Sequence, residues 1–391
     1  MVKAIISAPG RVCLFGEHMD WCGFYVLTAA VNMRSFLEAG PNNKSGSVEV
    51  YSYKPFDTYA SYNLSDLSID VGSDLSYVGG VLKAMFMNDP MKVFKDGLKL
   101  RFLKAEDVQS LTDADGLTDL PVSKGLSSSA AISVAIAAGI EMILKNPSSL
   151  GEVEDILSKE ENLARYASLA YTSERKVLGI ECGQMDQFAS AYGGILYIDC
   201  RFEPAKVERL NPKIEIPLVI GDTGQGKDTP RILAWLNKRY RLKEPEFMEG
   251  VKEIADVVLE AKRELGKDKP DLHKIGELMN TNQQYLARNL KVSGNCPISP
   301  SKLNVLVEAA IRAGALGAKL SGSGGGGCMV ALCLPGDVEK VAKAIEEADG
   351  KAYITRLANR GVRLEFFDLA GEGIRDGEGL TEPLPARSPL P

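Results

Sequence analysis

Short runs rich in β-branched and aromatic residues alternate with helical patterns along the first half of the chain. These runs predict strands at Lys3–Ser7, Arg34–Ala39, Ser47–Tyr53, Leu98–Leu103 and Gly194–Asp199. The stretch Ala130–Leu144 is almost entirely apolar and contains many small residues, which is typical of a buried helix. Glu152–Ala170 has amphipathic periodicity and predicts a further helix.

After the crossing segment Asn211–Pro217, the apolar run Leu218–Ile220 begins a second unit. Its helical patterns cover Arg231–Lys267, His273–Leu290, Pro300–Ala313 and Val338–Ala348. Its strand-like runs are Ala318–Leu320, Met329–Leu334, Ala352–Arg356 and Arg363–Phe367. We therefore expect an α+β fold of two lobes, residues 1–210 and 211–370, with the substrate in a cleft between them. Residues 371–391 are rich in Gly, Glu, Pro and Arg, and we expect them to be disordered.

Composition and charge narrow the possible functions. The net charge of −6 argues against a nucleic-acid or membrane-surface binder, because both binding modes need basic patches. No apolar run approaches the ~20 residues that span a bilayer, and MVKAIISAPGRV lacks a signal-peptide pattern. The dispersed cysteines favour reduced thiols in a cytoplasmic protein, and two histidines without metal-ligand spacing predict no structural zinc. We therefore expect a small-molecule substrate and no nucleic-acid or membrane partner.

The most informative segment is Pro121–Ala131, PVSKGLSSSAA, where a loop leads into the apolar helix. The first turn of a helix has free N–H donors and carries roughly half a positive charge, which favours an anion such as a triphosphate. Gly125 allows the backbone to approach phosphate closely, and serine hydroxyls can bind phosphate oxygens or Mg²⁺. A helix N-cap would explain one serine. Three in succession, Ser127–Ser129, exceed that need and favour a phosphate loop.

Two better-known nucleotide motifs are approached but not matched. Gly221–Lys227 fits G-x-x-x-x-G-K, but the next residue is Asp228, where a P-loop needs Ser or Thr for Mg²⁺ and where a carboxylate would repel phosphate. Gly322–Gly327 fits G-x-G-x-x-G, but the strand-like run Met329–Leu332 follows it, whereas the dinucleotide fingerprint opens a helix. A glycine run between apolar strands still predicts a closely packed functional loop rather than a flexible surface loop.

Polar side chains also gather near the N-terminus, in APGRVCLFGEHMDW from Ala8 to Trp21. Glu17, His18 and Asp20 lie in a stretch that is otherwise apolar or rich in glycine. A solvated face would account for one or two of them. Recognition of a polyol needs several hydrogen-bonding groups at fixed geometry, so we expect these residues to contact a hydroxyl-rich substrate.

Together, these three segments resemble the GHMP kinases, the superfamily of galactokinase, homoserine kinase, mevalonate kinase and phosphomevalonate kinase. The resemblance extends from about Lys3 to Phe367, and the motifs occur in the family's order. It implies a two-lobed α+β fold with a ribosomal S5 domain 2-like N-terminal domain and a ferredoxin-like α+β C-terminal domain. It also implies ATP and Mg²⁺ as cofactors. The implied ATP-binding residues are Gly125, Leu126, Ser127, Ser128, Ser129, Gly322, Gly324 and Gly325.

Within the superfamily, galactokinase and related sugar kinases are most similar. Gly10-Arg11-Val12 followed by Gly16–Asp20 resembles the galactokinase signature, whereas mevalonate kinases usually have Lys at the Arg11 position. Ser173–Arg175 and Cys182–Phe188 also resemble galactokinase at the matching spacing. The resemblance therefore implies transfer of the γ-phosphate of ATP to a sugar hydroxyl, the anomeric one, giving a sugar 1-phosphate and ADP.

The same resemblance assigns roles to individual residues. Asp186 is the implied catalytic base, since a well-placed carboxylate can accept the proton of an alcohol, and Arg11 is its electrostatic partner. Glu174 and Ser129, or Ser128 in place of Ser129, are the implied Mg²⁺ ligands. The implied substrate-binding residues are Glu17, His18, Asp20 and Asp186.

Some segments depart from the galactokinase pattern. Where galactokinases usually carry Ser-x-Tyr-Asn-x-Arg-Arg, Ala234–Arg239 contains no tyrosine before Asn237. Gly314–Leu320 looks closer to mevalonate kinase. A mevalonate-type isoprenoid kinase is therefore the second hypothesis, and a catalytically silent sugar sensor on the same fold is the third. The presence of Asp186 and Ser128–Ser129 favours an active enzyme.

Overall fold

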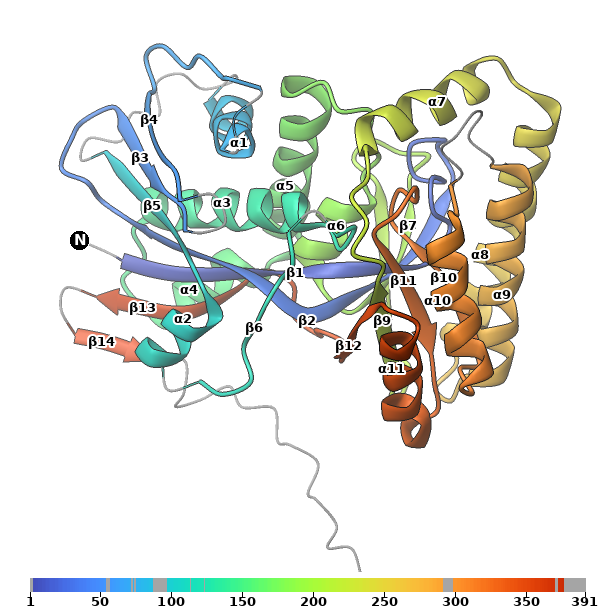
Figure 1. The fold of residues 1–391 in the computed structure, drawn as a ribbon. Coiled ribbons are helices and arrows are strands. Elements are labelled where there is room, and N and C mark those ends of the chain that lie inside the picture. The colour runs from blue at the N-terminus through green and yellow to red at the C-terminus, as the bar shows by residue number, and fades with distance from the viewer. Residues whose placement is uncertain are drawn as a thin grey trace, which may run out of the picture.

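The structure of the protein is a computed structural model that describes residues 3–53, 57–71, 73, 75–86, 97–112, 114–122, 124–290, 298–369 and 372–375. These residues form two β-sheets with helices packed against them (Figure 1). The larger sheet has the strand order β14-β13-β1-β2-β5-β3-β4; β6 and β7 also pair with β2, and β8 pairs with β7. The smaller sheet has the order β10-β11-β9-β12. The predicted α+β class is confirmed.

The strands of the larger sheet are β1 (Lys3–Phe15), β2 (Tyr25–Gly40), β3 (Ser47–Tyr51), β4 (Tyr59–Asn63), β5 (Leu98–Leu103), β6 (Thr118–Asp119), β7 (Ile195–Asp199), β8 (Lys206–Leu210), β13 (Arg363–Leu369) and β14 (Glu372–Arg375). Those of the smaller sheet are β9 (Leu218–Asp222), β10 (Gly317–Ser321), β11 (Cys328–Leu332) and β12 (Lys351–Thr355). The helices are α1 (Ser76–Phe86), α2 (Ala105–Thr112), α3 (Ser128–Lys145), α4 (Leu150–Ser158), α5 (Glu160–Thr172), α6 (Met185–Tyr192), α7 (Thr229–Arg241), α8 (Pro245–Leu265), α9 (Leu272–Asn289), α10 (Ser301–Arg312) and α11 (Val338–Glu347). A π-helical turn, η1 (Ser173–Val177), follows α5, and a 3₁₀ turn, η2 (Pro335–Asp337), precedes α11.

The core of the first half is built on the long antiparallel pair of β1 and β2, which α3 covers. Almost every residue of β1 is buried, because β2 and β13 flank it and α3 packs on it. The helix α3 is long and apolar enough to cross a membrane by length and composition alone, but 67 % of it is buried inside the protein. That burial is typical of a core helix, so the predicted buried helix over Ala130–Leu144 is confirmed.

The smaller sheet is antiparallel throughout, and α10 and α11 pack on it. The helices α8 and α9 pack against each other; α8 contacts β1 and β2, and α9 contacts β1 and β10. The backbone N–H of Cys13 in β1 donates to the hydroxyl of Ser321 in β10 at 3.1 Å. The end of β1 and the end of β10 therefore lie together, which brings the N-terminal polar cluster to the glycine-rich loop.

Two predicted helices are each divided in two. The predicted helix over Glu152–Ala170 is α4 and α5, because Lys159 has extended backbone angles (φ −64°, ψ 129°). There the side-chain amide of Asn162 donates at 3.1 Å to a carbonyl near the end of α4, in place of a helical bond. The pattern over Arg231–Lys267 is α7 and α8, because Pro245 begins α8 and a proline disfavours helical angles in the residue before it.

The end of the chain differs from the sequence-based expectation. One strand of the second predicted lobe, β13, pairs with β1 in the larger sheet, and the boundary at residues 210 and 211 remains a prediction. Disorder over residues 371–391 is wrong for Glu372–Arg375, which form β14 because their backbone groups find partners on β13. Residues 376–391 lie outside the described residues, as does Cys296.

Candidate active site

A cavity of about 530 Å³ lies where several distant segments meet. Its walls come from β1 and the turn after it, the loop before α3, the η1–α6 segment, the β9–α7 connection and the loop between β10 and β11. The predicted site residues that line it are Arg11, His18, Asp20, Gly125, Ser127, Ser128, Ser129, Glu174, Asp186 and Gly322. The predicted site residues that do not line it are Glu17, Leu126, Gly324 and Gly325.

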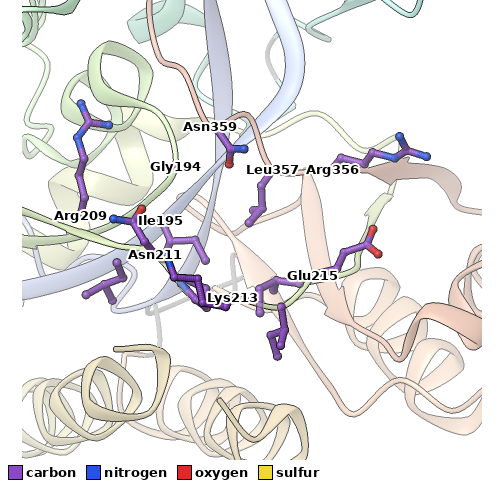
Figure 2. A pocket seen from close by; sticks show the side chains of 13 residues that line it. Gly194, Ile195, Arg209, Asn211, Lys213, Glu215, Arg356, Leu357 and Asn359 are labelled. Carbon is purple, nitrogen blue, oxygen red and sulfur yellow. The ribbon is translucent and has the colours of Figure 1, made fainter. Parts of the chain in front are cut away.

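A second cavity, of about 400 Å³, lies beside the segment that connects β8 to β9. Its charged residues include Arg209, Lys213, Glu215 and Arg356. In Figure 2 the guanidinium groups of Arg209 and Arg356 point to opposite sides, so the cations do not converge on one point. Because no predicted site residue lines this cavity, the first cavity is the candidate active site.

Asp186 and Arg11 form the charged centre of the candidate site. Asp186 lies in the first turn of α6, and Arg11 lies on β1. The Nε and Nη2 atoms of Arg11 approach Asp186 Oδ1 at 2.8 and 2.6 Å. The Asp186 side chain is 30 % exposed and that of Arg11 only 3 %, so the carboxylate faces the cavity. Burial opposes the charge on Arg11, but the adjacent Asp186 carries the pKa of Arg11 above its ordinary value.

Arg11 also fixes the serine loop. Its Nη1 atom donates to the Gly125 carbonyl at 2.7 Å, and its backbone N–H donates to the Leu126 carbonyl at 3.1 Å. Leu126 is buried and thus holds the loop on β1 rather than lining the cavity. Ser127 has a left-handed φ of 64°, and α3 begins at Ser128. Within the described structure the buried Ser127 hydroxyl has no hydrogen-bond partner, so it can bind a phosphate oxygen at this helix start.

Glu174 and Ser129 lie together on one wall of the cavity. Glu174 belongs to the π-helical turn η1, a feature that is frequent at functional sites. Its carboxylate accepts hydrogen bonds from Ser129 Oγ at 3.4 Å and from Gln187 Nε2 at 3.0 Å. Burial, and then the charge of Asp186, raise the pKa of Glu174 to about 7.

This pair of residues fits a magnesium site. Mg²⁺ in kinases is held by one or two protein oxygens together with substrate phosphates. A buried Glu174 carboxylate that forms no ion pair with a described residue, next to the Ser129 hydroxyl, supplies such oxygens. No group of three or more His, Cys, Asp or Glu side chains among the described residues could hold a metal without the phosphates.

Asp20 presents a further carboxylate near Asp186. Its Oδ2 atom accepts a hydrogen bond from the backbone N–H of Met185 at 3.3 Å. A Cβ atom at Gly183 would lie 2.1 Å from this oxygen, so the close approach requires glycine. Burial, and then the charge of Asp186, raise the pKa of Asp20 to about 6. Asp20 is therefore held where a substrate hydroxyl can donate to it.

His18 connects the N-terminal turn to the glycine-rich loop. Trp21 Nε1 donates to His18 Nδ1 at 3.2 Å, so His18 carries its proton on Nε2, which donates to the Ser323 carbonyl at 3.2 Å. Burial lowers the pKa of His18 to about 4, and the ring is neutral at pH 7. Because protein groups occupy both ring nitrogens, the geometry supports a positioning role instead of the predicted hydrogen bond to substrate.

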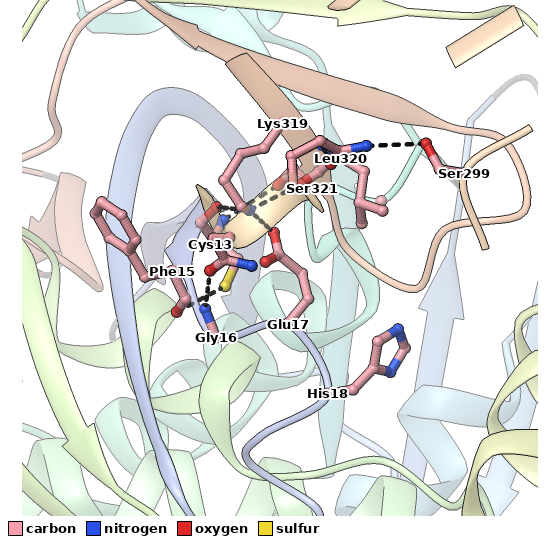
Figure 3. A network of polar contacts seen from close by, with 12 residues as sticks. Cys13, Phe15, Gly16, Glu17, His18, Ser299, Lys319, Leu320 and Ser321 are labelled. Atoms are coloured by element: carbon pink, nitrogen blue, oxygen red, sulfur yellow. Dashed lines mark hydrogen bonds and ion pairs between the residues drawn. The ribbon is translucent and has the colours of Figure 1, made fainter. Parts of the chain in front are cut away.

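Glu17 is not brought to the cavity, in contrast to its predicted contact with substrate. Figure 3 shows Lys319 of β10 reaching Glu17, and Lys319 Nζ also donates to the carbonyls of Cys13 and Leu320 at 3.1 and 2.8 Å. Both charged side chains are fully buried. A buried carboxylate needs a cation, and this ion pair fastens the N-terminal turn to β10.

The glycine-rich loop meets the serine loop through backbone atoms. Gly322 has a φ of 95°, and a Cβ atom there would lie 3.0 Å from the Gly125 carbonyl oxygen. Gly324 and Gly325 contact Ile298 instead: the Gly325 N–H donates to its carbonyl at 2.8 Å, and a Cβ at Gly324 would lie 2.3 Å from the same oxygen. Gly322 thus lines the cavity, whereas Gly324 and Gly325 support the loop in place of their predicted contact with ATP.

Several residues that line the cavity were not predicted from the sequence. Lys227 ends the segment that the sequence excludes as a P-loop because of Asp228. Asp228 in fact caps α7, where its Oδ1 atom accepts a hydrogen bond from the backbone N–H of Arg231 at 3.1 Å. The other missed lining residues include Trp21, Tyr77, Thr229, Pro230 and Leu233. The lysine of G-x-x-x-x-G-K was a signal that could have been followed.

Family models match three parts of the chain: the galactokinase galactose-binding signature over residues 2–41, the GHMP kinases N terminal domain over 115–194, and the GHMP kinases C terminal over 259–351. A mevalonate kinase from Pyrococcus horikoshii is 33 % identical to this chain over 93 % of the chain and 99 % of its own length. The chain belongs to the GHMP kinase family. This GHMP kinase is a phosphotransferase with an alcohol group as acceptor, and kinases of the family use ATP.

Other relatives of this GHMP kinase include galactokinases and mevalonate kinases. A galactokinase from Pyrococcus furiosus is 28 % identical over 92 % of this chain and 96 % of its own length. The structure of Lactococcus lactis galactokinase complexed with galactose matches with a TM-score of 0.71 at 21 % identity, covering 92 % of this chain and 95 % of its own. The Methanococcus jannaschii mevalonate kinase matches with a TM-score of 0.66 at 23 % identity, covering 91 % and 98 %. These structural matches show the two-domain GHMP kinase fold.

Proposed function

We propose that this GHMP kinase transfers the γ-phosphate of ATP to the anomeric hydroxyl of a sugar, giving a sugar 1-phosphate and ADP. The observation that carries the proposal is the partly buried carboxylate of Asp20 near Asp186. Two neighbouring carboxylates favour an acceptor that donates hydrogen bonds through hydroxyl groups, and they repel an anionic acceptor. The galactose-binding signature over residues 2–41 includes Asp20 and supports the same assignment.

In this mechanism, Asp186 accepts the proton of the acceptor hydroxyl as that oxygen attacks the γ-phosphorus. The exposed fraction of its side chain, 30 %, leaves the carboxylate accessible from the cavity. Arg11 orients Asp186 through its contacts at 2.8 and 2.6 Å. Its guanidinium also places positive charge where the phosphoryl group passes, which stabilises the transition state.

The serine loop supplies the donor side of the site. The N–H groups at the start of α3 and the unpartnered Ser127 hydroxyl would bind the phosphates of ATP. Glu174 and Ser129 would hold Mg²⁺, which neutralises charge on the phosphates when it is bound. The Arg11 contact with the Gly125 carbonyl, at 2.7 Å, keeps this donor loop beside the catalytic base.

A mevalonate-type kinase is the alternative. It is favoured by the identity to mevalonate kinase, 33 %, against 28 % to galactokinase. Mevalonate, however, carries a carboxylate, which would lie in the same cavity as Asp20, Asp186 and Glu174. We place the sugar first because Asp20, unlike Asp186, forms no ion pair with a described residue, and its charge disfavours an acceptor carboxylate beside it. The cations of the cavity, Arg11 and Lys227, lie at the Gly125 loop.

The test is the rate of ADP release from Mg-ATP with separate acceptors: galactose, glucose, mannose, arabinose, N-acetylhexosamines, uronic acids, inositol and mevalonate. We expect strong turnover with one neutral sugar. Asp20→Asn should then raise the KM for that sugar by about tenfold or more, because a hydrogen bond to a charged group is lost. Asp256→Asn, an exposed carboxylate on α8, is the matched control and should change nothing.

Two results would contradict the proposal. Turnover with mevalonate alone would favour the alternative enzyme. No turnover with any acceptor, by folded protein that binds ATP, would favour a sugar sensor on this fold.

A further inference from the structure

Lys227 lies between the two glycine loops of the active site, although it belongs to neither. It lies in the β9–α7 connection, two positions before the first residue of α7. A Cβ atom at Gly125 would lie 2.8 Å from Lys227 Nζ, and one at Gly322 would lie 3.5 Å from it. A Cβ at Gly327 would lie 3.4 Å from the Cδ and Cε atoms of the same side chain. The missing side chains of these glycines therefore leave the space in which the lysine lies.

The Lys227 ammonium has no hydrogen-bond or ion-pair partner among the residues that the structure describes. Carboxylates near it are already paired: Asp186 with Arg11, and Asp222 with Lys124 at 3.0 Å. Burial first, and then the charge of Arg11, lower the pKa of Lys227 to about 8. A partly buried cation that lines a cavity without an anion is best satisfied by an anionic ligand.

The position identifies which anion that is. Gly125, in the serine loop, accepts a hydrogen bond from the Arg11 guanidinium at 2.7 Å, and a Cβ atom on it would lie 2.8 Å from the Lys227 ammonium. Arg11 in turn contacts the base Asp186. Arg11 thus connects the loop that would hold the ATP phosphates to the carboxylate that would receive the acceptor's proton, and Lys227 lies beside the same loop.

We propose that Lys227 is a catalytic residue whose ammonium contacts the γ-phosphoryl group as it moves from ATP to the acceptor. In this step a bond forms between the acceptor oxygen and the γ-phosphorus, and the bond from that phosphorus to the β–γ bridging oxygen breaks, releasing ADP. The acceptor proton passes to Asp186. Lys227 keeps its protons and offsets charge on the transferring oxygens. The proposal rests on the kinase reaction and is independent of which alcohol is the acceptor.

The lysine thereby performs the task of a P-loop lysine from a different scaffold. In a P-loop, the lysine belongs to the same loop whose backbone binds the phosphates. Here the phosphate-binding backbone would be the loop before α3, and the lysine comes from the β9–α7 connection. Asp228, whose carboxylate does not fit a P-loop, is the N-cap of α7 and accepts a hydrogen bond from the backbone N–H of Arg231.

The test compares two nucleotides, ADP and the non-hydrolysable ATP analogue AMP-PNP, by calorimetry in the presence of Mg²⁺. Lys227→Met should weaken AMP-PNP binding by about tenfold at pH 7 and leave ADP binding within about twofold, because only AMP-PNP carries a γ-phosphate. Turnover should fall by about 10²–10³-fold, as for loss of one preorganised transition-state donor. Lys238→Met, at an exposed lysine of α7, is the matched control and should change neither.

A second readout follows from the titration of the lysine. The charged groups that face Lys227 are Arg11 on β1, Asp186 on α6 and Asp222 on β9. The Cys328 thiol on β11, whose pKa burial raises to about 12, and neutral His18 also lie near it. The ammonium is present below pH 8 and is lost above it, so wild-type affinity for AMP-PNP relative to ADP should fall between pH 7 and pH 9. The same ratio should not change for Lys227→Met.

Several results would overturn the proposal. Equal weakening of ADP and AMP-PNP would place the lysine at the inner phosphates. An increase confined to the KM of the acceptor would make it an anchor for an anionic acceptor. Unchanged binding and turnover would give it no role in the reaction. If Lys227→Met does not fold, Lys227→Gln and the wild-type pH comparison decide the same question.

Discussion

Replacement of Asp186 by asparagine keeps the size of the side chain and removes its charge. Asparagine cannot accept the acceptor's proton, and general base catalysis contributes typically 10²–10⁴-fold, so we expect turnover to fall by about that factor. Asp186 contacts Arg11 and not the serine loop, so the Kd for Mg-ATP should change by less than about threefold.

The same substitution has a cost in stability that can be separated from its effect on catalysis. It leaves the buried Arg11 guanidinium, 3 % exposed, without its anion. Breaking a buried ion pair costs about 3–5 kcal/mol, and the 30 % exposure of Asp186 lets water reduce this toward about 2 kcal/mol. Urea denaturation measures this loss, ADP release measures turnover, and calorimetry measures ATP binding. Near-normal turnover of folded Asp186→Asn would refute the assignment of Asp186 as the base.

Further predictions concern the metal, the histidine and the buried ion pair. Glu174→Gln should raise the Mg²⁺ concentration for half-maximal turnover by about tenfold or more, and an unchanged Mg²⁺ titration would exclude Glu174 as a ligand. His18 has a pKa of about 4 in the fold and about 6.5 when unfolded, so stability present above pH 6.5 is lost as the pH falls toward 4. Denaturation at pH 7 and at pH 4.5 measures how much free energy of unfolding is lost on acidification. In His18→Gln this loss should be smaller than in the wild type by up to about 3 kcal/mol, and an equal loss in the two proteins would contradict the assignment. Lys319→Met should destabilise the fold by about 3–5 kcal/mol in urea, and adding Glu17→Gln should recover part of it; additive losses would argue against the pair.

Local sequence patterns predicted most elements of the fold because those elements depend on local chemistry. The apolar helix α3 and the strand Leu98–Leu103 follow from residue type and periodicity. The break at Lys159 did not, because it depends on a side-chain hydrogen bond from Asn162 that periodicity does not report. The strand Glu372–Arg375 was missed because its stability comes from pairing with β13, whereas its composition suggests a tail.

The candidate site was also predicted only in part from the sequence. Arg11, Asp186, Ser129 and Glu174 lie in motifs with recognisable spacing, and the structure brings them to one cavity. Glu17 belongs to the same motif as Asp20, but its direction is set by Lys319, which is distant in sequence. The local sequence does not indicate which of these two carboxylates will form an ion pair with a lysine from β10. Tertiary contacts therefore decide which motif residues face the substrate.

The most direct test of the central claim is the identity of the phosphorylated product. The wild-type enzyme would be incubated with Mg-ATP and an equimolar mixture of the candidate sugars and mevalonate, and the product would be examined by ³¹P–¹H correlation NMR. We expect a phosphate ester on the anomeric carbon of one sugar. Phosphomevalonate, or a phosphate on another sugar hydroxyl, would contradict it.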